Sequence, residues 1–191
     1  DVILVAREEK KLQEVAQLCQ NEARVIVKDL SMEENCKELY EELKNEDIDI
    51  LINNAGFGVY GTFAETNLDT ELSMIRTNVV AMHILMKLFL QDMNQRGKGR
   101  ILNVSSSAGF MPGPLMSSYY ASKAYILRLS EGVREELNKE KSKVTISVLC
   151  PGPVRTNFNK VAGVNFGIHS LSSQQVANYA VKKLLKGKFM I

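Results

Sequence analysis

The sequence predicts an α/β fold in which helices cover both faces of a doubly wound parallel sheet, giving three layers, α/β/α. Short apolar runs rich in β-branched residues alternate along the chain with longer segments of helical period, a pattern typical of parallel sheets. Polar, proline or glycine residues follow the apolar runs, and ligands of doubly wound sheets bind beyond the carboxyl ends of the strands. The 191 residues, 45% hydrophobic and 24% charged, fit one domain over residues 1–191.

Each predicted strand is a short apolar run that ends in polar or turn-forming residues. In chain order the five strands lie within "VILVA" (2–6), "RVIVKDL" (24–30), "IDILINNAG" (48–56), "GRILNVSSSAG" (99–109) and "KVTISVLCPGPV" (143–154). The last residues, "GKFMI", have the pattern of a final strand that begins there. Because the polar ends of all five strands meet at one edge of a parallel sheet, we expect a cleft at that edge.

Between the strands, apolar residues recur at helical spacing. The predicted helices cover residues 8–22, a segment from about residue 31, and residues 67–95, 117–140 and 172–188. Glu33 and Glu34 lie in the first turn of the second helix, where carboxylates are favourable. Asn67 or Thr70 can cap the third helix, and a serine pair begins the last one. These capping signals support the helices independently of the apolar spacing.

Composition limits the classes of function. The formal charge of +2 is too small to indicate a nucleic-acid or anionic-membrane partner. The uninterrupted apolar runs are well short of the ~20 residues of a transmembrane helix, so we expect no such segment. Cys19, Cys36 and Cys150 are an odd number without the spacing of a metal site. We therefore expect no metal centre, and a reducing, cytoplasmic location.

Tyr119 and Lys123 are four residues apart, a spacing that places both side chains on one face of a helix. The same spacing also occurs at Tyr40–Lys44 and Tyr179–Lys183, so it identifies nothing by itself. Only Tyr119 has a serine thirteen residues before it, Ser106, which directly follows a predicted strand. This offset separates the candidate site from the other two pairs, which we expect on solvated helix faces.

The segments "NNAG", "TNVVAMH", "NVSSSAG", "YYASK" and "PGPVRT" occur in this order and cover nearly the whole chain. Their order and approximate spacing closely resemble the classical short-chain dehydrogenase/reductase family. The resemblance implies a Rossmann-like fold, a nicotinamide dinucleotide as cofactor, and oxidation or reduction between an alcohol and a carbonyl compound.

The resemblance also implies catalytic roles for four residues: Asn78, Ser106, Tyr119 and Lys123. A tyrosine titrates near ~10, and the Lys123 ammonium one turn away should lower that pKa, so that Tyr119 can exchange a proton with the substrate oxygen. Ser106 would hydrogen-bond that oxygen. Lys123 would also hold the nicotinamide ribose, and Asn78 would anchor a water linking Lys123 to solvent. For Asn78, a kink or a cap within its helix is the alternative role.

Cofactor residues follow in the same way. Ala6 occupies what resembles the family's acidic position for NAD, and Arg7 follows it; since arginine suits a 2′-phosphate, we expect NADP(H), with NAD(H) possible. Alternatively, Arg7 could pair with Glu8 or Glu9. The remaining residues that the resemblance assigns to the cofactor are Asp29, Leu30, Asn53, Asn54, Ala55, Gly56, Tyr119, Lys123, Pro151, Gly152, Val154 and Thr156.

The family's glycine-rich phosphate loop has no counterpart in this sequence. Without it, the strands at 2–6 and 24–28 would lack the neighbour that joins them to the strand at 48–52. We interpret the chain as an internal fragment of a longer protein, inactive alone; a natural variant that has lost cofactor binding is the alternative.

We expect the substrate to be an apolar or amphipathic ketone or aldehyde, because residues 57–63, 109–116 and 161–168 would line its pocket and carry few charges. We also expect a homodimer or homotetramer, formed through the helices over 67–95 and 117–140 as in the family. Two other functions remain open: a catalytically silent dinucleotide-binding or scaffold protein, and a nucleotide-sugar epimerase or dehydratase.

Overall fold

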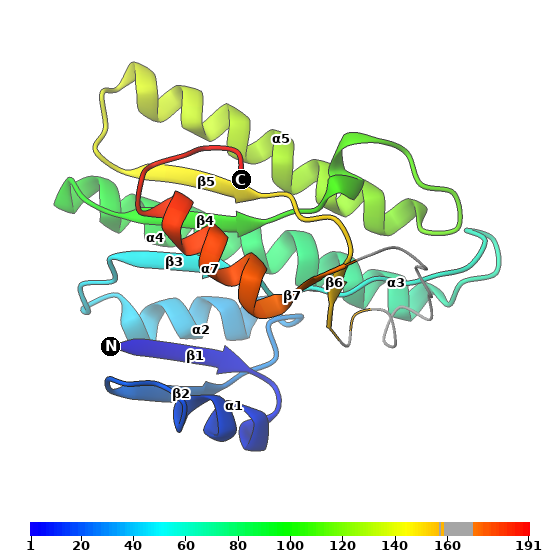
Figure 1. The fold of residues 1–191 in the computed structure, drawn as a ribbon, viewed down its shortest axis with the longest axis horizontal. Helices are drawn as coiled ribbons and strands as arrows, with labels where there is room; N and C mark the ends of the chain where they lie inside the picture. Colours follow the sequence, from blue (N-terminus) through cyan, green and yellow to red (C-terminus); the bar gives the residue numbers. More distant parts are fainter. Residues whose placement is uncertain (157, 159–169) are drawn as a thin grey trace.

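A computed structural model describes residues 1–156, 158 and 170–191 (Figure 1). The strands are β1 (Val2–Ala6), β2 (Ala23–Val27), β3 (Ile50–Asn53), β4 (Arg100–Val104), β5 (Thr145–Leu149), β6 (Val154–Arg155) and β7 (Leu171–Ser172). The helices are α1 (Glu9–Ala16), α2 (Glu33–Leu43), α3 (Leu68–Ile75), α4 (Met82–Arg96), α5 (Ser117–Lys139) and α7 (Ser173–Leu184), with a π-helical segment η1 (Arg76–Ala81) and a 3-10 turn η2 (Ser107–Phe110). The predicted alternation of strands and helices is confirmed.

Parallel pairing joins the strands into two main sheets. β1 pairs with β2, while β3, β4 and β5 form a second sheet in that order. In Figure 1 the arrowheads of both sheets point to the same side, so their carboxyl ends share one edge of the molecule. Met190 bridges in parallel to Val148 of β5, which confirms that a further strand begins at the end of the chain.

No described strand connects the two sheets, as the sequence led us to expect for the first two strands. Helices hold them together instead. Leu39 of α2 and Phe89 of α4 pack into a core cluster that includes Ile26 of β2 and contacts Leu51 of β3. Side-chain packing, and not backbone pairing, therefore sets the position of β1 and β2 relative to the larger sheet.

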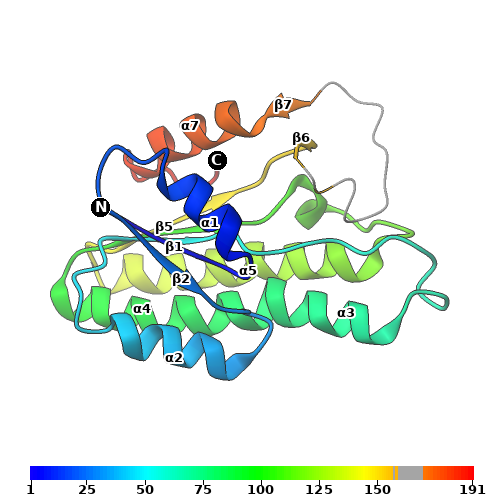
Figure 2. The same cartoon turned by 90° about the horizontal axis from the view of Figure 1, so that it is seen from below.

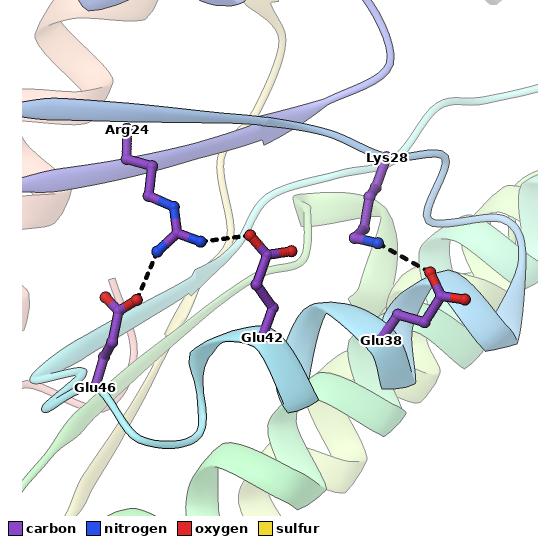
Figure 3. Close-up of polar contacts among 5 residues, drawn as sticks. All are labelled: Arg24, Lys28, Glu38, Glu42 and Glu46. Atoms are coloured by element: carbon purple, nitrogen blue, oxygen red, sulfur yellow. Dashed lines mark hydrogen bonds and ion pairs between the residues drawn. The ribbon is translucent and has the colours of Figure 1, made fainter.

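Ion pairs add to this attachment at the outer strand (Figure 3). Arg24 of β2 contacts two carboxylates, Glu42 near the end of α2 and, at 2.6 Å, Glu46 just beyond it. Lys28 Nζ lies 3.0 Å from Glu38 Oε2, one turn earlier on α2. Since later strand residues meet earlier helix residues, the three contacts hold β2 antiparallel to α2.

Helices cover both faces of the sheets, which confirms the three-layer arrangement. Figure 2 shows α1 and α7 on one face and α2, α3, α4 and α5 on the other. Met82, Met86 and Met93 of α4 are at most 4% exposed and pack in a cluster with Ile101 of β4 and Ile126 of α5. This cluster packs α4 and α5 against the sheet of β3, β4 and β5.

The helical stretch Leu68–Arg96 is long and apolar enough to cross a membrane by length and composition. The sequence analysis considered only uninterrupted apolar runs and did not identify it. Its apolar side chains include Met74, Met86 and Phe89, which are buried in the core. Packing against the sheet and α5 accounts for these buried side chains, which belong to the 39% of the apolar window that lies inside the structure.

The structure differs from the sequence prediction in one helix end, in the regularity of one helix and in one additional strand pair. The helix predicted over 8–22 ends at Ala16, because Leu18 beyond it is 82% exposed and has no apolar surface to prolong the helix against. The stretch predicted as one helix over 67–95 contains the π-helical segment η1. β6 and β7 form a two-residue parallel pair that is too short to leave a period in the sequence.

Two glycines shape the turn between α4 and β4. Gly97 caps α4 with a φ of +68°, and a Cβ added there would meet nothing within 4 Å. Gly99 has a φ of +156°, and a Cβ there would lie 2.4 Å from Cγ of Met93, which is fully buried. Both positions use the backbone freedom of glycine, and Gly99 also needs the absence of a side chain.

We expect Gly99→Ala to lower the free energy of unfolding more than Gly97→Ala does. A positive φ costs an alanine about 1–2 kcal/mol at either position, and contact with Met93 adds about 1–3 kcal/mol of overpacking at Gly99. Urea denaturation of both variants beside the wild type measures the difference. Equal losses would show that Met93 moves aside without cost.

Candidate active site

The carboxyl ends of β3, β4 and β5 bring the candidate residues to one edge, above the N-terminal half of α5 (Figure 1). Hydrogen bonds between asparagines link these elements. Asn53 at the end of β3 donates to Asn103 Oδ1 of β4 at 2.9 Å, and Asn103 donates to Ser130 Oγ of α5, also at 2.9 Å. Asn53 and Asn103 are paired in the sheet register. This buried chain of amides fixes α5 against the strands below the site.

Asn78 lies in the π-helical segment η1 and is completely buried. Its Oδ1 accepts from the Phe57 amide at 3.0 Å, and its Nδ2 donates to the Phe57 carbonyl at 2.9 Å. Asn78 thereby holds the loop that follows β3. A Cβ on Gly56 would lie 2.8 Å from Asn78 Oδ1, so this close approach depends on glycine.

The Ser122 hydroxyl connects Asn78 to α5. Asn78 Nδ2 also donates to Ser122 Oγ at 3.1 Å, and Ser122 Oγ donates to the Tyr119 carbonyl at 2.7 Å. π-helical turns inside α-helices are frequent at functional sites because they redirect side chains. Here the irregular turn aims Asn78 at both the loop after β3 and the helix that carries Tyr119 and Lys123.

Lys123 is buried, and its ammonium donates to the Val104 carbonyl at the end of β4 at 2.9 Å. Burial lowers the pKa of Lys123 to about 8, because an ammonium is less stable away from water. The carbonyl of Lys123 accepts from Ser105 Oγ at 2.7 Å. Both polar ends of this residue are therefore bonded to the chain segment that leaves β4.

Tyr119 lies one turn before Lys123 and is 9% exposed. Burial raises the pKa of Tyr119 above its ordinary value, and the Ser106 hydroxyl lowers it by a smaller amount. The expectation that Lys123 lowers this pKa is wrong for the structure as it stands. Lys123 Nζ lies 5.7 Å from the centre of the Tyr119 ring and bonds the Val104 carbonyl instead, so loss of hydration decides the direction.

Ser106 follows β4 at the start of η2, where its hydroxyl accepts from the Ala108 amide at 3.2 Å. Its hydroxyl also donates to the Pro151 carbonyl at 3.4 Å, and the amide of Ser107 donates to the same carbonyl at 2.9 Å. The segment after β5 is thus joined to the segment after β4. Ser106, Tyr119 and Lys123 are brought together as predicted.

Apolar side chains surround the exposed side of Tyr119. Phe158 packs on its ring with the ring centres 5.2 Å apart, and the same cluster contains Phe57, Val59, Met74, Ala108, Met116 and Tyr120. A Cβ on Gly58 would lie 2.9 Å from Phe158 and 3.0 Å from Met116. Residues 161–168, which we expected in the substrate pocket, lie outside the described residues.

Arg7 and Asp29 follow β1 and β2, away from the catalytic group. Arg7 lines a hollow of about 310 Å³ together with Ala6, Glu8, Lys11, Leu12 and Val15. Burial acts to raise the pKa of Asp29, but hydrogen bonds from Ser31 and the charge of Arg7 outweigh it, so this pKa lies below its usual value. Leu30 packs into the core cluster under β2. The structure therefore places Arg7 beside Asp29 and gives Leu30 a packing contact.

The other predicted cofactor residues lie on the open edge. Asn54, Ala55 and Gly56 are exposed directly after β3. Gly152 is exposed in the turn after β5, and Val154 begins β6. Thr156 Oγ1 accepts from the Phe158 amide at 3.1 Å. These residues leave an exposed strip along the strand ends, where a Cβ on Gly56 would lie 3.6 Å from Lys123 Nζ.

Sequence reasoning missed the groups that orient the site. Ser105, Ser122, Asn103 and Ser130 are all nearly fully buried polar residues with hydrogen-bond partners. The sequence did contain a sign of these residues, because polar residues stand at positions where the pattern calls for apolar ones. Asn103 lies inside the apolar run of β4, and Ser122 adjoins Lys123 on the inward face of α5.

The two other Tyr–Lys pairs have structural positions. Tyr179 is 54% exposed with Lys183 over its ring, which confirms a solvated helix face. Tyr40, which we also expected on a solvated helix face, instead packs between two helices. Its hydroxyl donates to Asp92 at 2.9 Å, and its ring packs edge-on against Phe89, so Tyr40 joins α2 to α4.

Comparison with known proteins places this site in a family. Residues 1–164 match the family described as short chain dehydrogenase. The chain is 39% identical over 150 residues to the ketoacyl reductase HetN of Nostoc sp., covering 74% of this chain and 49% of that protein. It is 30% identical over 171 residues to human 17-beta-hydroxysteroid dehydrogenase type 3, covering 86% of this chain and 54% of that protein. The chain thus spans about half the length of these two relatives.

A solved structure shows the same arrangement in space. A short-chain dehydrogenase from Sphingobium yanoikuyae in complex with NADPH superposes with a TM-score of 0.90 at 26% identity, covering 98% of this chain and 76% of that one. Together with the family match over most of the chain and the joined Ser106, Tyr119 and Lys123, this shows that the chain belongs to the short-chain dehydrogenase family.

Proposed function

We propose that the protein carrying this chain is an NADP(H)-dependent oxidoreductase that reduces an apolar ketone or aldehyde to an alcohol. The observation that carries the proposal is the meeting of Ser106, Tyr119 and Lys123 at the strand edge, with a lysine buried beside a buried tyrosine. Packing alone does not require a buried ammonium, which is costly to desolvate.

The proposed chemistry follows from the state of each group. When bound, the reduced nicotinamide supplies the hydride that the carbonyl carbon accepts. Ser106 donates a hydrogen bond to the carbonyl oxygen, and Tyr119 donates the proton that this oxygen needs to become a hydroxyl. The raised pKa of Tyr119 keeps its phenol protonated at neutral pH, as a proton donor requires. Lys123, to which the family resemblance assigns the nicotinamide ribose, would hold the cofactor beside Tyr119.

The substrate class rests on the surroundings of Tyr119. Phe57, Val59, Met116 and Phe158 pack around its ring and contribute no charge. A ligand that reaches Tyr119 along this wall must bury apolar surface against it. The two similar curated proteins are named for ketoacyl and hydroxysteroid substrates, which agrees with an apolar carbonyl compound.

The cofactor preference rests on Arg7. Glu8 forms an ion pair with Lys11 at 2.8 Å. Its carboxylate is therefore paired with Lys11 and not with Arg7. Arg7 lines the hollow beyond β1, where its guanidinium suits a 2′-phosphate better than a bare ribose hydroxyl. A similar dehydrogenase of known structure binds NADPH.

The outer face of α4 and α5 is proposed to pair with a second copy of the chain. His83 Nδ1 lies 2.8 Å from the Tyr125 hydroxyl across these helices, and Tyr125 is 39% exposed. Ala121 and Gly132 are exposed on the same side of α5, and a Cβ on Gly132 would meet nothing within 4 Å. Small residues here leave room for a helix from a partner.

Tyr119→Phe should lower kcat for NADPH-dependent carbonyl reduction by about 10²–10⁴-fold, since it removes the proton donor and leaves the ring. The measurement is NADPH oxidation with a panel of apolar ketones and aldehydes. Tyr179→Phe is the matched control, because it alters a tyrosine with the same spacing to a lysine on a solvated face. Turnover that persists in Tyr119→Phe would refute the assignment.

Arg7→Asp should weaken NADPH binding by about 10–100-fold, because a charge-assisted contact of about 1.5–3 kcal/mol is lost. NADH, which lacks the 2′-phosphate, should bind no more weakly than before. Dissociation constants from cofactor fluorescence give the ratio directly. A parallel loss for both cofactors would place Arg7 away from the phosphate.

Gly132→Arg should shift the protein toward the monomer in size-exclusion chromatography with light scattering, because the new side chain blocks close helix approach. Asn138→Arg is the control, since it adds the same charge about 120° around α5. An unchanged assembly in both variants would exclude this face as the contact.

A further inference from the structure

The helical stretch before Asn78 faces the start of α5 in three successive layers. Glu71 of α3 contacts Ser118, Met74 packs in one cluster with Tyr119, and Asn78 contacts Ser122. On the first side Glu71 and Asn78 are seven residues apart, and on the other side Ser118 and Ser122 are four residues apart, so each polar pair lies on one face of its helical stretch. Tyr119 therefore sits between two polar layers, one formed by Asn78 and the other by Glu71.

The Glu71 layer is a clamp that joins three segments. Glu71 Oε2 accepts from Ser118 Oγ at 2.9 Å, and Ser118 directly precedes Tyr119. Glu71 Oε1 accepts from Thr66 Oγ1 at 2.7 Å. Thr66 ends the loop from residue 57 to residue 66, which carries Phe57 and Val59 of the apolar wall. Both carboxylate oxygens are thus used, each by a different segment beside Tyr119.

A second contact closes the same region. The amide of Gly61 in this loop donates to the Leu115 carbonyl at 2.8 Å. Leu115 has a φ of +67°, an unfavourable backbone conformation for a leucine that persists only where surrounding contacts impose it. The loop and the chain entering α5 are therefore tied at two places, Gly61–Leu115 and Thr66–Glu71–Ser118.

We infer that Glu71 is a positioning residue for Tyr119: through Ser118 and Thr66 it fixes the first turn of α5 against the apolar wall, so that the phenol is held in line with the substrate oxygen. This inference rests on the proposed function of Tyr119 as proton donor. Glu71 acts at a distance from the reacting atoms, through Ser118.

The size of the effect follows from geometry. A displacement of about 1 Å at a reacting group can cost up to about 10²-fold in rate. Removing the carboxylate frees two hydroxyls at once and leaves the Gly61–Leu115 hydrogen bond and the packing of Met74 against the cluster of Tyr119. Glutamine retains an oxygen that accepts from Ser118 and offers an amide to the Thr66 hydroxyl. It should therefore restore most of the loss.

The experiment compares Glu71→Ala, Glu71→Gln and Ser118→Ala in kcat, KM, NADPH affinity and thermal unfolding. Glu65→Ala is the matched control, because Glu65 accepts from Thr62 in the same loop at 2.6 Å and forms no hydrogen bond or ion pair with α5 among the described residues. We expect Glu71→Ala to lower kcat roughly tenfold, with Kd for NADPH unchanged, Glu71→Gln near wild type and Glu65→Ala without effect. Adding Ser118→Ala to Glu71→Ala should cost no more, because the two residues act through one contact.

A readout independent of turnover uses the ionisation of Tyr119, followed by the ¹³Cζ signal of labelled tyrosine and assigned with Tyr119→Phe. Glu71→Ala should lower the pKa of Tyr119 toward its ordinary value, since a looser first turn of α5 lets water reach the phenol. An unchanged pKa with unchanged kcat would overturn the positioning role. A kcat that falls only in proportion to the folded fraction would overturn it as well. Loss of turnover in Tyr119→Phe with no effect of Glu71→Ala would refute this inference alone, whereas turnover in Tyr119→Phe would refute the proposed function.

Discussion

A buried ammonium must find hydrogen-bond acceptors, and this requirement at Lys123 organises the site. The acceptor is the Val104 carbonyl, which is free because β4 ends there and its next residues turn into η2. The Ser105 hydroxyl, in the same turn, donates a hydrogen bond to the Lys123 carbonyl. A Cβ on Gly109 would lie 2.9 Å from that carbonyl, so the turn and α5 approach each other closely at a glycine. The end of one strand and one turn of α5 therefore define each other's position. Because Tyr119 lies one turn earlier on the same helix, its location follows from the docking of Lys123.

The second organising feature is the irregular turn between α3 and α4. An ordinary helix would present its side chains at a uniform pitch, whereas the π-helical segment turns Asn78 toward both Phe57 and Ser122. Asn78 thereby connects the loop after β3 to α5 without contacting a strand. Asn78 and the hydrogen-bonded residues Asn53, Asn103 and Ser130 thus place paired polar groups on two sides of the site. Such networks hold catalytic side chains within narrow limits.

The sequence predicted the strands, the sheet edge and the proximity of Ser106, Tyr119 and Lys123, because these depend on apolar period and on fixed offsets between residues. For the same local reason it proposed Asn67 or Thr70 as the cap of the third helix, and the structure shows that Asn67 is the cap and accepts from the Thr70 amide. It could not predict the π-helical segment, since "RTNVVA" has the apolar spacing of an ordinary helix. It also gave the wrong direction for the pKa of Tyr119, because spacing shows that Lys123 is near but not how deeply the phenol is buried or which carbonyl takes the ammonium. Glu71 escaped notice because Ser118 lies on another helix, 47 residues away, and Thr66 lies in the loop before α3, where no period indicates a contact.

The depressed pKa of Lys123, about 8 against an ordinary 10.5, also has a thermodynamic side. The unfolded chain holds this proton up to pH about 10.5, and the folded chain releases it near 8, so between these values folding is linked to proton release and this group makes the native state more stable as pH rises. Below pH 8 the folded chain carries the full penalty, on the order of 3 kcal/mol. An apolar residue of similar length would avoid the cost of desolvating an ammonium, but it would also remove the charged group from the site. The buried lysine therefore makes the folded chain less stable than an apolar residue at this position would. It also places a charged group in the site whose pKa lies close to physiological pH.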